Sequence, residues 1–171
     1  MFTKADIEKY FHAEKSESWL FIAIAVVAVI AAIIFFFFIK TNFYKGAAAP
    51  LLLIGLLLGI TGFTVYKRSD EDSLRNVYAY DMNPSQLKAQ EIPRMETVMK
   101  NFVIYRYAEI ALALLGISLF VYFKNNEVHQ FWKGFGIALT IMALLALAAD
   151  YFAEKRGHDY LIGLQEFTKA K

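Results

Sequence analysis

Four apolar runs, each about as long as a bilayer is thick, constrain this chain more than any other feature. They cover residues 20–39, 47–66, 107–123 and 134–149, and Glu109 is the one charged residue among them. A helix rises about 1.5 Å per residue, so roughly 20 apolar residues cross roughly 30 Å of hydrocarbon. The sequence therefore predicts four membrane-spanning helices, at about residues 19–40, 47–67, 104–124 and 132–152.

Composition supports one membrane-embedded domain over residues 1–171. The chain is 58% hydrophobic, and the four runs leave too little sequence for a separate globular unit. Its net charge of +2, with acids and bases interleaved, excludes a nucleic-acid partner and leaves the lipid bilayer as the predicted surroundings. Cysteine is absent, which excludes disulfides, thiol nucleophiles and cysteine-based zinc sites.

The distribution of basic residues predicts the orientation. Four of the 18 lysines and arginines, Lys40, Lys45, Lys124 and Lys133, belong to the two short loops on one side. The other fourteen lie in the N-terminal segment, the central loop of residues 68–103 with its flanks, and the tail of residues 153–171. By the positive-inside rule, both termini are then cytoplasmic and the protein resides in the cell membrane. The first 18 residues contain three lysines and four acids, so we expect a retained first span and no cleaved signal.

Local signals predict how the spans continue outside the membrane. The first residues, with Ile7, Tyr10 and Phe11 on one face, are expected to form a short interfacial helix on the inner leaflet. Residues 67–80 can extend the second span as a helix, and Asn83 followed by Pro84 is typical of a helix start. Pro93 is expected to interrupt that helix, and Pro50 to lie in the first turns of its span.

The C-terminal region completes the predicted architecture. Gly157 offers a stop to the fourth span, after which the tail would fold back as a short amphipathic helix. The short outer loops require neighbouring spans to run antiparallel. The fold class predicted from the sequence is therefore an all-α, integral membrane, antiparallel four-helix bundle with helical cytoplasmic extensions.

Small residues recur at helical spacing in every span and predict the packing faces. Lipid is as apolar as leucine, so spans associate where small side chains let their backbones approach. The predicted contacts in the last three spans are made by Gly55, Gly59, Gly62, Ala113, Gly116 and Gly136. The pattern at Gly55 and Gly59 favours a contact within the monomer, with a homo-oligomer as the alternative.

Three ionisable residues lie in or at the edge of the spans and are the candidate site. Arg106, Glu109 and Asp150 all fall near the predicted inner interface, and an Arg106–Asp150 bridge with Glu109 beside it fits the spacing. Because charge is costly in a membrane, such residues pair or carry a function. A structural ion pair is one interpretation, and a site for a proton, ion or solute is the other.

No motif predicts an enzyme, a cofactor or a catalytic residue. Nucleophile elbows, phosphate loops and zinc-protease motifs are absent, and no histidine lies at the middle of a span to bind haem. His12 follows Glu8, and His158 follows Glu154, by four residues each, but such pairs favour solvated surface over a metal site. The acidic run of residues 70–72 indicates a solvated helix face more than a magnesium cluster.

Two functions remain open on this sequence. The first is a small interaction, assembly or regulatory protein that binds a protein partner through its cytoplasmic helices. The second is a small oligomeric channel or carrier that uses Arg106, Glu109 and Asp150. The low polarity of the spans favours the first, and a non-enzymatic role with it.

Overall fold

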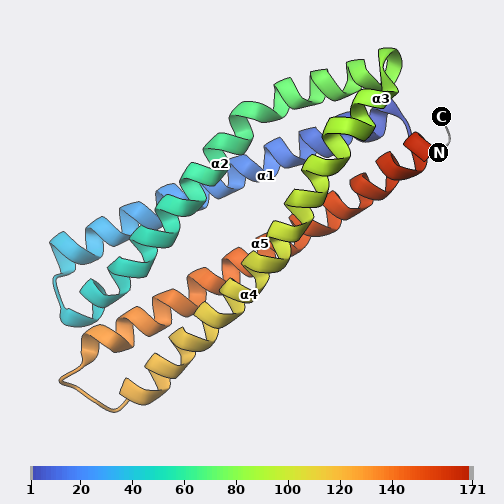
Figure 1. Ribbon diagram of the computed structural model, residues 1–171. Helices are drawn as coiled ribbons and strands as arrows, with labels where there is room; N and C mark the ends of the chain where they lie inside the picture. The colour runs from blue at the N-terminus through green and yellow to red at the C-terminus, as the bar shows by residue number, and fades with distance from the viewer. Residues whose placement is uncertain (1, 170–171) are drawn as a thin grey trace.

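The computed structural model describes residues 2–169, which form helices packed as a bundle (Figure 1). The long helices are α1 (Lys4–Ile34), α2 (Asn42–Met82), α4 (Ile92–Phe123) and α5 (Gln130–Lys169). A π-helical turn, η1 (Phe35–Ile39), ends the first, while α3 (Pro84–Gln86) and the π-helical η2 (Leu87–Glu91) lead into α4. The predicted all-α bundle is confirmed, and four helical segments are long and apolar enough to cross a membrane.

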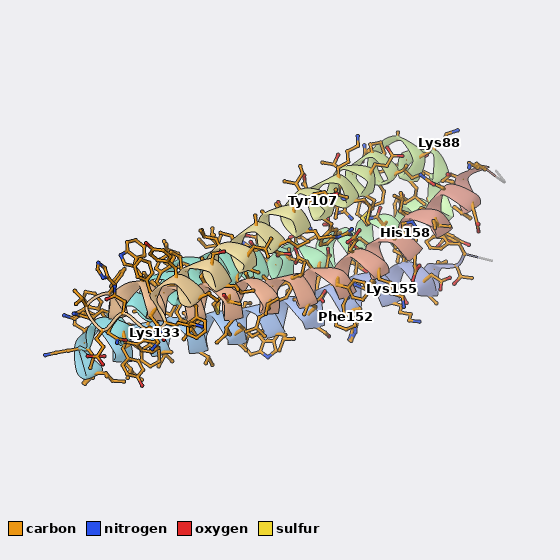
Figure 2. All side chains as sticks on the ribbon, turned by 90° about the horizontal axis from the view of Figure 1, so that it is seen from below. Lys88, Tyr107, Lys133, Phe152, Lys155 and His158 are labelled. Carbon is orange, nitrogen blue, oxygen red and sulfur yellow. The ribbon has the colours of Figure 1, made fainter. Side chains whose placement is uncertain are left out.

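Two helical hairpins make up the bundle. Helix α1 packs along α2, α4 packs along α5, and α2 packs against α5 to join the hairpins. The short loops after η1 and α4 lie at one end, here called the hairpin end (Figure 1). The two ends of the described chain and α3 lie at the other, the terminal end. Figure 2 places Lys133 near the hairpin end, and Lys88 and His158 toward the terminal end.

The N-terminal segment is part of the first long helix, so the expected separate interfacial helix is wrong. Helix α1 runs without a break from Lys4 to Ile34, beginning at Thr3 with a capping box formed with Asp6. Its apolar face is buried within the protein: Ile7 and Phe11 are almost fully covered. The amphipathic pattern allowed this apolar face to pack either on lipid or on other helices, and in the structure it packs on other helices.

The tail likewise continues the fourth long helix and does not fold back. Helix α5 extends through Gly157 to Lys169, because this glycine keeps a helical backbone and lies against the side chains of Met95 and Met99. A glycine ends a helix only where it adopts a left-handed conformation. The tail packs against α4 at this point, and α5 continues through Gly157 without a break.

Proline positions also differ from expectation. The helix start at Pro84 is confirmed, but Pro93 lies inside a continuous helical segment. The π-helical turn η2 immediately precedes it, and the wider turn displaces the carbonyl that the proline ring would otherwise strike. Pro50 is an interior residue of α2, which begins at Asn42 and continues, as expected, beyond residue 80.

Burial divides the bundle into two halves along its axis. In the apolar half, residues 19–66 and 104–152, the helices meet at alanine and glycine, and most large apolar side chains face outward. In the polar half, residues 2–18, 67–103 and 153–169, large side chains face inward. The core of the polar half consists of Ile7, Tyr10, Phe11, Ala79, Leu87, Met95, Tyr160 and Leu164.

Candidate functional site

Arg106 makes its ion pair with a different residue from the one expected. Its guanidinium contacts the carboxylate of Glu154, one turn beyond Asp150 on α5. The arginine side chain remains 43% exposed at the junction of the two halves. The sequence placed Arg106 close to the level of Asp150 along the bundle but did not distinguish between acids one turn apart on the facing helix.

Glu109 and Asp150 face each other, so their carboxyl groups interact across α4 and α5. Over the residues described, neither forms a salt bridge, and one oxygen of Glu109 is buried without a hydrogen-bond partner. Two carboxylates repel unless a proton or a cation lies between them. The structure thus brings all three predicted ionisable residues to one level of the bundle, with Arg106 bound to Glu154 and the two carboxyls left without a basic partner.

The predicted packing residues lie at helix contacts within the chain. A β-carbon built on Gly55 would lie 3.1 Å from Cβ of Ala28, and one on Gly59 would lie 3.2 Å from Cβ of Ala25. The corresponding atom on Gly62 would come within 2.9 Å of a backbone oxygen of α1. These three glycines therefore let α1 and α2 approach closely.

Glycines also let the two helices of the second hairpin, α4 and α5, approach closely. A β-carbon on Gly116 would lie 2.7 Å from the carbonyl oxygen of Gly136, and one on Gly136 would lie 2.6 Å from that of Gly116. Ala113, one turn earlier on α4, is buried in the same contact face. At this crossing the two backbones touch each other, which leaves no room for any side chain.

The polar half contains a buried ionic cluster that the sequence analysis missed. Glu91 is 2% exposed and accepts two hydrogen bonds from Arg94, at 2.8 and 2.6 Å. Arg75 of α2 approaches the same carboxylate at 4.0 Å, and the hydroxyl of Tyr160 on α5 donates to it at 3.3 Å. We call Arg75, Glu91, Arg94 and Tyr160 the Glu91 cluster. It links α2, η2, α4 and α5 around one carboxylate.

Helix α1 joins this cluster through aromatic contacts. The ring of Tyr10 stacks on Tyr160 with a centroid distance of 4.1 Å, and its hydroxyl lies 3.7 Å from Sδ of Met95. The Arg94 guanidinium lies over the ring of Phe11 at 5.9 Å. Burial raises the pKa of the Tyr10 and Tyr160 hydroxyls, which keeps both neutral as hydrogen-bond donors.

A second polar group connects α1 and α2 between the cluster and the apolar half. Glu14 lies 3.5 Å from Arg68 and accepts a hydrogen bond of 3.3 Å from Ser69, while Glu17 pairs with Arg156 of α5. Burial raises the pKa of Glu14, although the positive charge of Arg68 opposes that shift. A glutamate on the apolar face of Ile7 and Phe11 was the signal that could have revealed it.

The outer surface of the polar half carries an exposed apolar stripe on α2. Leu74, Tyr78 and Met82 are 73%, 64% and 69% exposed, and their spacing of four residues places them along one side of the helix. All three lie beyond the apolar half, where the neighbouring surface is charged. Grouped large apolar side chains on a surface facing water are typical of a protein-binding site.

Within residues 2–169, no three histidine or acidic side chains come together as they would around a metal ion. His12 lines a groove between α1 and α2 with Lys15, Trp19 and Tyr66, and the groove does not bring it to His158. Comparisons of the chain with models of protein families, with curated proteins and with solved structures find no match.

Proposed function

We propose that this chain is a four-span protein of the cell membrane, with both termini and the polar half in the cytoplasm. Four helical segments of suitable length and hydropathy support the insertion, and the excess of basic residues at the terminal end supports the orientation. The outward-facing leucines, isoleucines and phenylalanines of the apolar half match a hydrocarbon solvent.

Its role is that of an interaction, assembly or regulatory protein that binds a protein partner through the polar half. The observation that carries this proposal is the exposed stripe of Leu74, Tyr78 and Met82. Beneath it, Asp72, Asn76 and Ala79 of the same helix are buried, so the stripe is held on a fixed surface. A preformed surface loses little conformational entropy when a partner binds.

Photo-crosslinking in intact cells tests this role. A photoreactive phenylalanine analogue replaces Tyr78, and a matched probe replaces Tyr122, which is 80% exposed at the hairpin end. The proposal predicts a stoichiometric adduct from position 78 that is absent from position 122. Combining Leu74→Ser with Met82→Ser should remove the adduct without changing thermal stability, since both side chains are exposed.

Two outcomes would contradict the proposal. Equal adducts from positions 78 and 122 would show that the stripe has no special role. An adduct of twice the chain's mass of 19.5 kDa would identify a second copy in place of a different partner.

A channel or carrier is the second candidate, favoured by the facing carboxyls of Glu109 and Asp150. The hydroxyls nearer the hairpin end do not extend a polar path, since Ser118 and Thr140 each donate to a carbonyl of their own helix. Proton or cation flux into liposomes, lost in Glu109→Gln, would establish transport. Its absence would leave the partner-binding role.

A further inference from the structure

A groove of about 530 Å³ lies between α4 and α5 at the junction of the two halves. The backbones of the two helices lie closest near their connecting loop and farther apart toward the terminal end (Figures 1 and 2), where larger side chains such as Met99, against Gly157, fill the space between them. Leu144, Tyr151 and Phe152, which line the groove, are exposed, so it opens onto the outer surface of the bundle.

The charged groups of the groove lie together at one level of the bundle axis, with apolar side chains toward the hairpin end. Arg106, Asp150 and Glu154 line this level, and Phe102 lies one turn further toward the terminal end on α4. Ile110, Leu147 and Leu144 line the next one to two helical turns toward the hairpin end. Because α4 and α5 are antiparallel, both walls change in the same direction and at the same level. A polar head and an apolar tail in this order are the features of a membrane lipid.

The depth of the polar end also matches a lipid headgroup. Arg106 lies 17 residues before Phe123, the last residue of α4. At about 1.5 Å per residue this separation is about 26 Å, close to the thickness of the hydrocarbon core. With the hairpin end at one membrane surface, the guanidinium of Arg106 therefore lies at the level of the opposite headgroups.

The charges at the polar end complement a zwitterionic headgroup with a primary ammonium. Arg106 uses Nη2 to bind Glu154 and has further donors and 43% of its side chain exposed, as a phosphate would require. Asp150 lines the groove and, over the described residues, has no salt bridge. An ammonium group would supply the positive charge that the facing carboxyls of Asp150 and Glu109 lack.

We propose that the groove between α4 and α5 binds one phosphatidylethanolamine molecule of the inner leaflet. Its phosphate contacts Arg106, its ammonium contacts Asp150 and Glu154, and one acyl chain lies along Ile110, Leu147 and Leu144. Phosphatidylglycerol lacks the ammonium, and the methylated ammonium of phosphatidylcholine cannot donate hydrogen bonds to a carboxylate. This inference rests on the membrane insertion proposed above and does not depend on a protein partner.

Native mass spectrometry of the full chain in detergent tests the proposal. At equal concentrations of the three dioleoyl lipids, phosphatidylethanolamine should remain bound about tenfold more than the other two, as expected for one charge-assisted hydrogen-bonded contact. Asp150→Asn should remove that preference. The asparagine amide can donate to Glu109, so the helix contact is retained.

A variant in the apolar region of the groove separates lipid binding from a general effect on folding. Leu144→Trp should reduce binding of all three lipids, because the indole occupies the place of the acyl chain. Leu53→Trp, on the exposed surface of α2, is the control and should leave binding unchanged. Both positions are exposed, so neither change should prevent folding.

The results that overturn the proposal are specific. Equal retention of the three lipids by the wild type, or a preference for phosphatidylglycerol, would exclude the ethanolamine headgroup as ligand. An unchanged preference in Asp150→Asn would exclude this groove as its site. A chain that remains in solution without detergent would refute the membrane insertion itself, which distinguishes the two failures.

Discussion

The two halves of this bundle use opposite rules of packing along the same helices. In the apolar half the contacts are made by glycine and alanine, and Phe63 is 62% exposed. In the polar half the contacts are made by aromatic rings and buried ions, and Phe11 is 1% exposed. Water drives large apolar side chains inward, whereas lipid does not, so this change of rule is what the proposed membrane insertion predicts.

The halves also differ in how they use charge. Glu91 has two arginines and a tyrosine hydroxyl around it, while the facing carboxyls of Glu109 and Asp150 have no basic partner in the described structure. Buried ions paired in this way hold helices in one arrangement. A pair of facing carboxyls without a basic partner is where an external ligand would contribute most.

The largest expected effect compares two phenylalanines. Phe11→Ala should destabilise the protein by about 3–5 kcal/mol, because it leaves a cavity in the core of the polar half. Phe63→Ala should change stability by less than about 0.5 kcal/mol, since this ring faces outward. Unfolding of both variants in detergent, followed by circular dichroism, measures the difference. Equal losses would show that the two halves are packed in the same way.

The next largest loss of stability is expected from a substitution in the Glu91 cluster. Glu91→Gln keeps the shape of the side chain but removes the charge that receives two bonds from Arg94, and should cost about 1.5–3 kcal/mol. Glu96→Gln, at an exposed position of α4, is the control and should be nearly neutral. A Glu91→Gln protein as stable as the wild type would mean that the cluster contributes nothing to the polar half.

Substitution by alanine at two glycines of α5 should change the stability of the protein in opposite directions. Gly136→Ala places a methyl group against the backbone of α4 and should destabilise by about 1–3 kcal/mol. In Gly157→Ala the methyl meets only Met99 and Met95, whose ends can move, so the gain in helix propensity stabilises by up to about 1 kcal/mol. Unfolding of the Gly136→Ala and Gly157→Ala variants in urea or detergent measures the direction of each change in stability. If both changes stabilised the protein, the close backbone contact between α4 and α5 at Gly136 would be refuted.

The smallest effect concerns pH. Since burial raises the pKa of Glu14 above the value of about 4.5 that it has when unfolded, the folded protein binds the extra proton more tightly. Glu14 therefore lowers stability above its folded pKa, and this loss disappears as pH falls toward 4.5. Glu14→Gln should flatten the stability profile above pH 4.5. A profile that keeps its full slope in the variant would assign the titration to another group.

The sequence was informative where one residue type decides the structure. Long apolar runs predicted long apolar helices, and Asn83 with Pro84 predicted a helix start, because neither signal depends on distant contacts. The interruption expected at Pro93 and the stop expected at Gly157 depended on context. A π-helical turn and two methionines of α4, respectively, allow the helix to continue there.

The position of the candidate site along the helices could be predicted from the sequence, but the ion-pair partner of Arg106 could not. Helical spacing placed Arg106 and Asp150 at nearly the same height, but the choice between Asp150 and Glu154, one turn apart on the same face, depends on the axial register of α5 against α4 at contacts such as that of Gly116 with Gly136. The Glu91 cluster involves four elements separated in sequence, and local patterns do not reveal such a convergence. Its only local sign was a glutamate at the spacing of Leu87 and Met95.

Single-cysteine spin labelling tests the central claim of opposite solvents most directly, because the natural chain contains no cysteine. Labels replace Leu57 in the apolar half and Tyr78 in the polar half, both about two-thirds exposed, in protein reconstituted into liposomes. The account predicts that the label at 57 is relaxed by oxygen and protected from a water-soluble nickel complex, and that the label at 78 shows the reverse. Equal access of the nickel complex to both labels would contradict it.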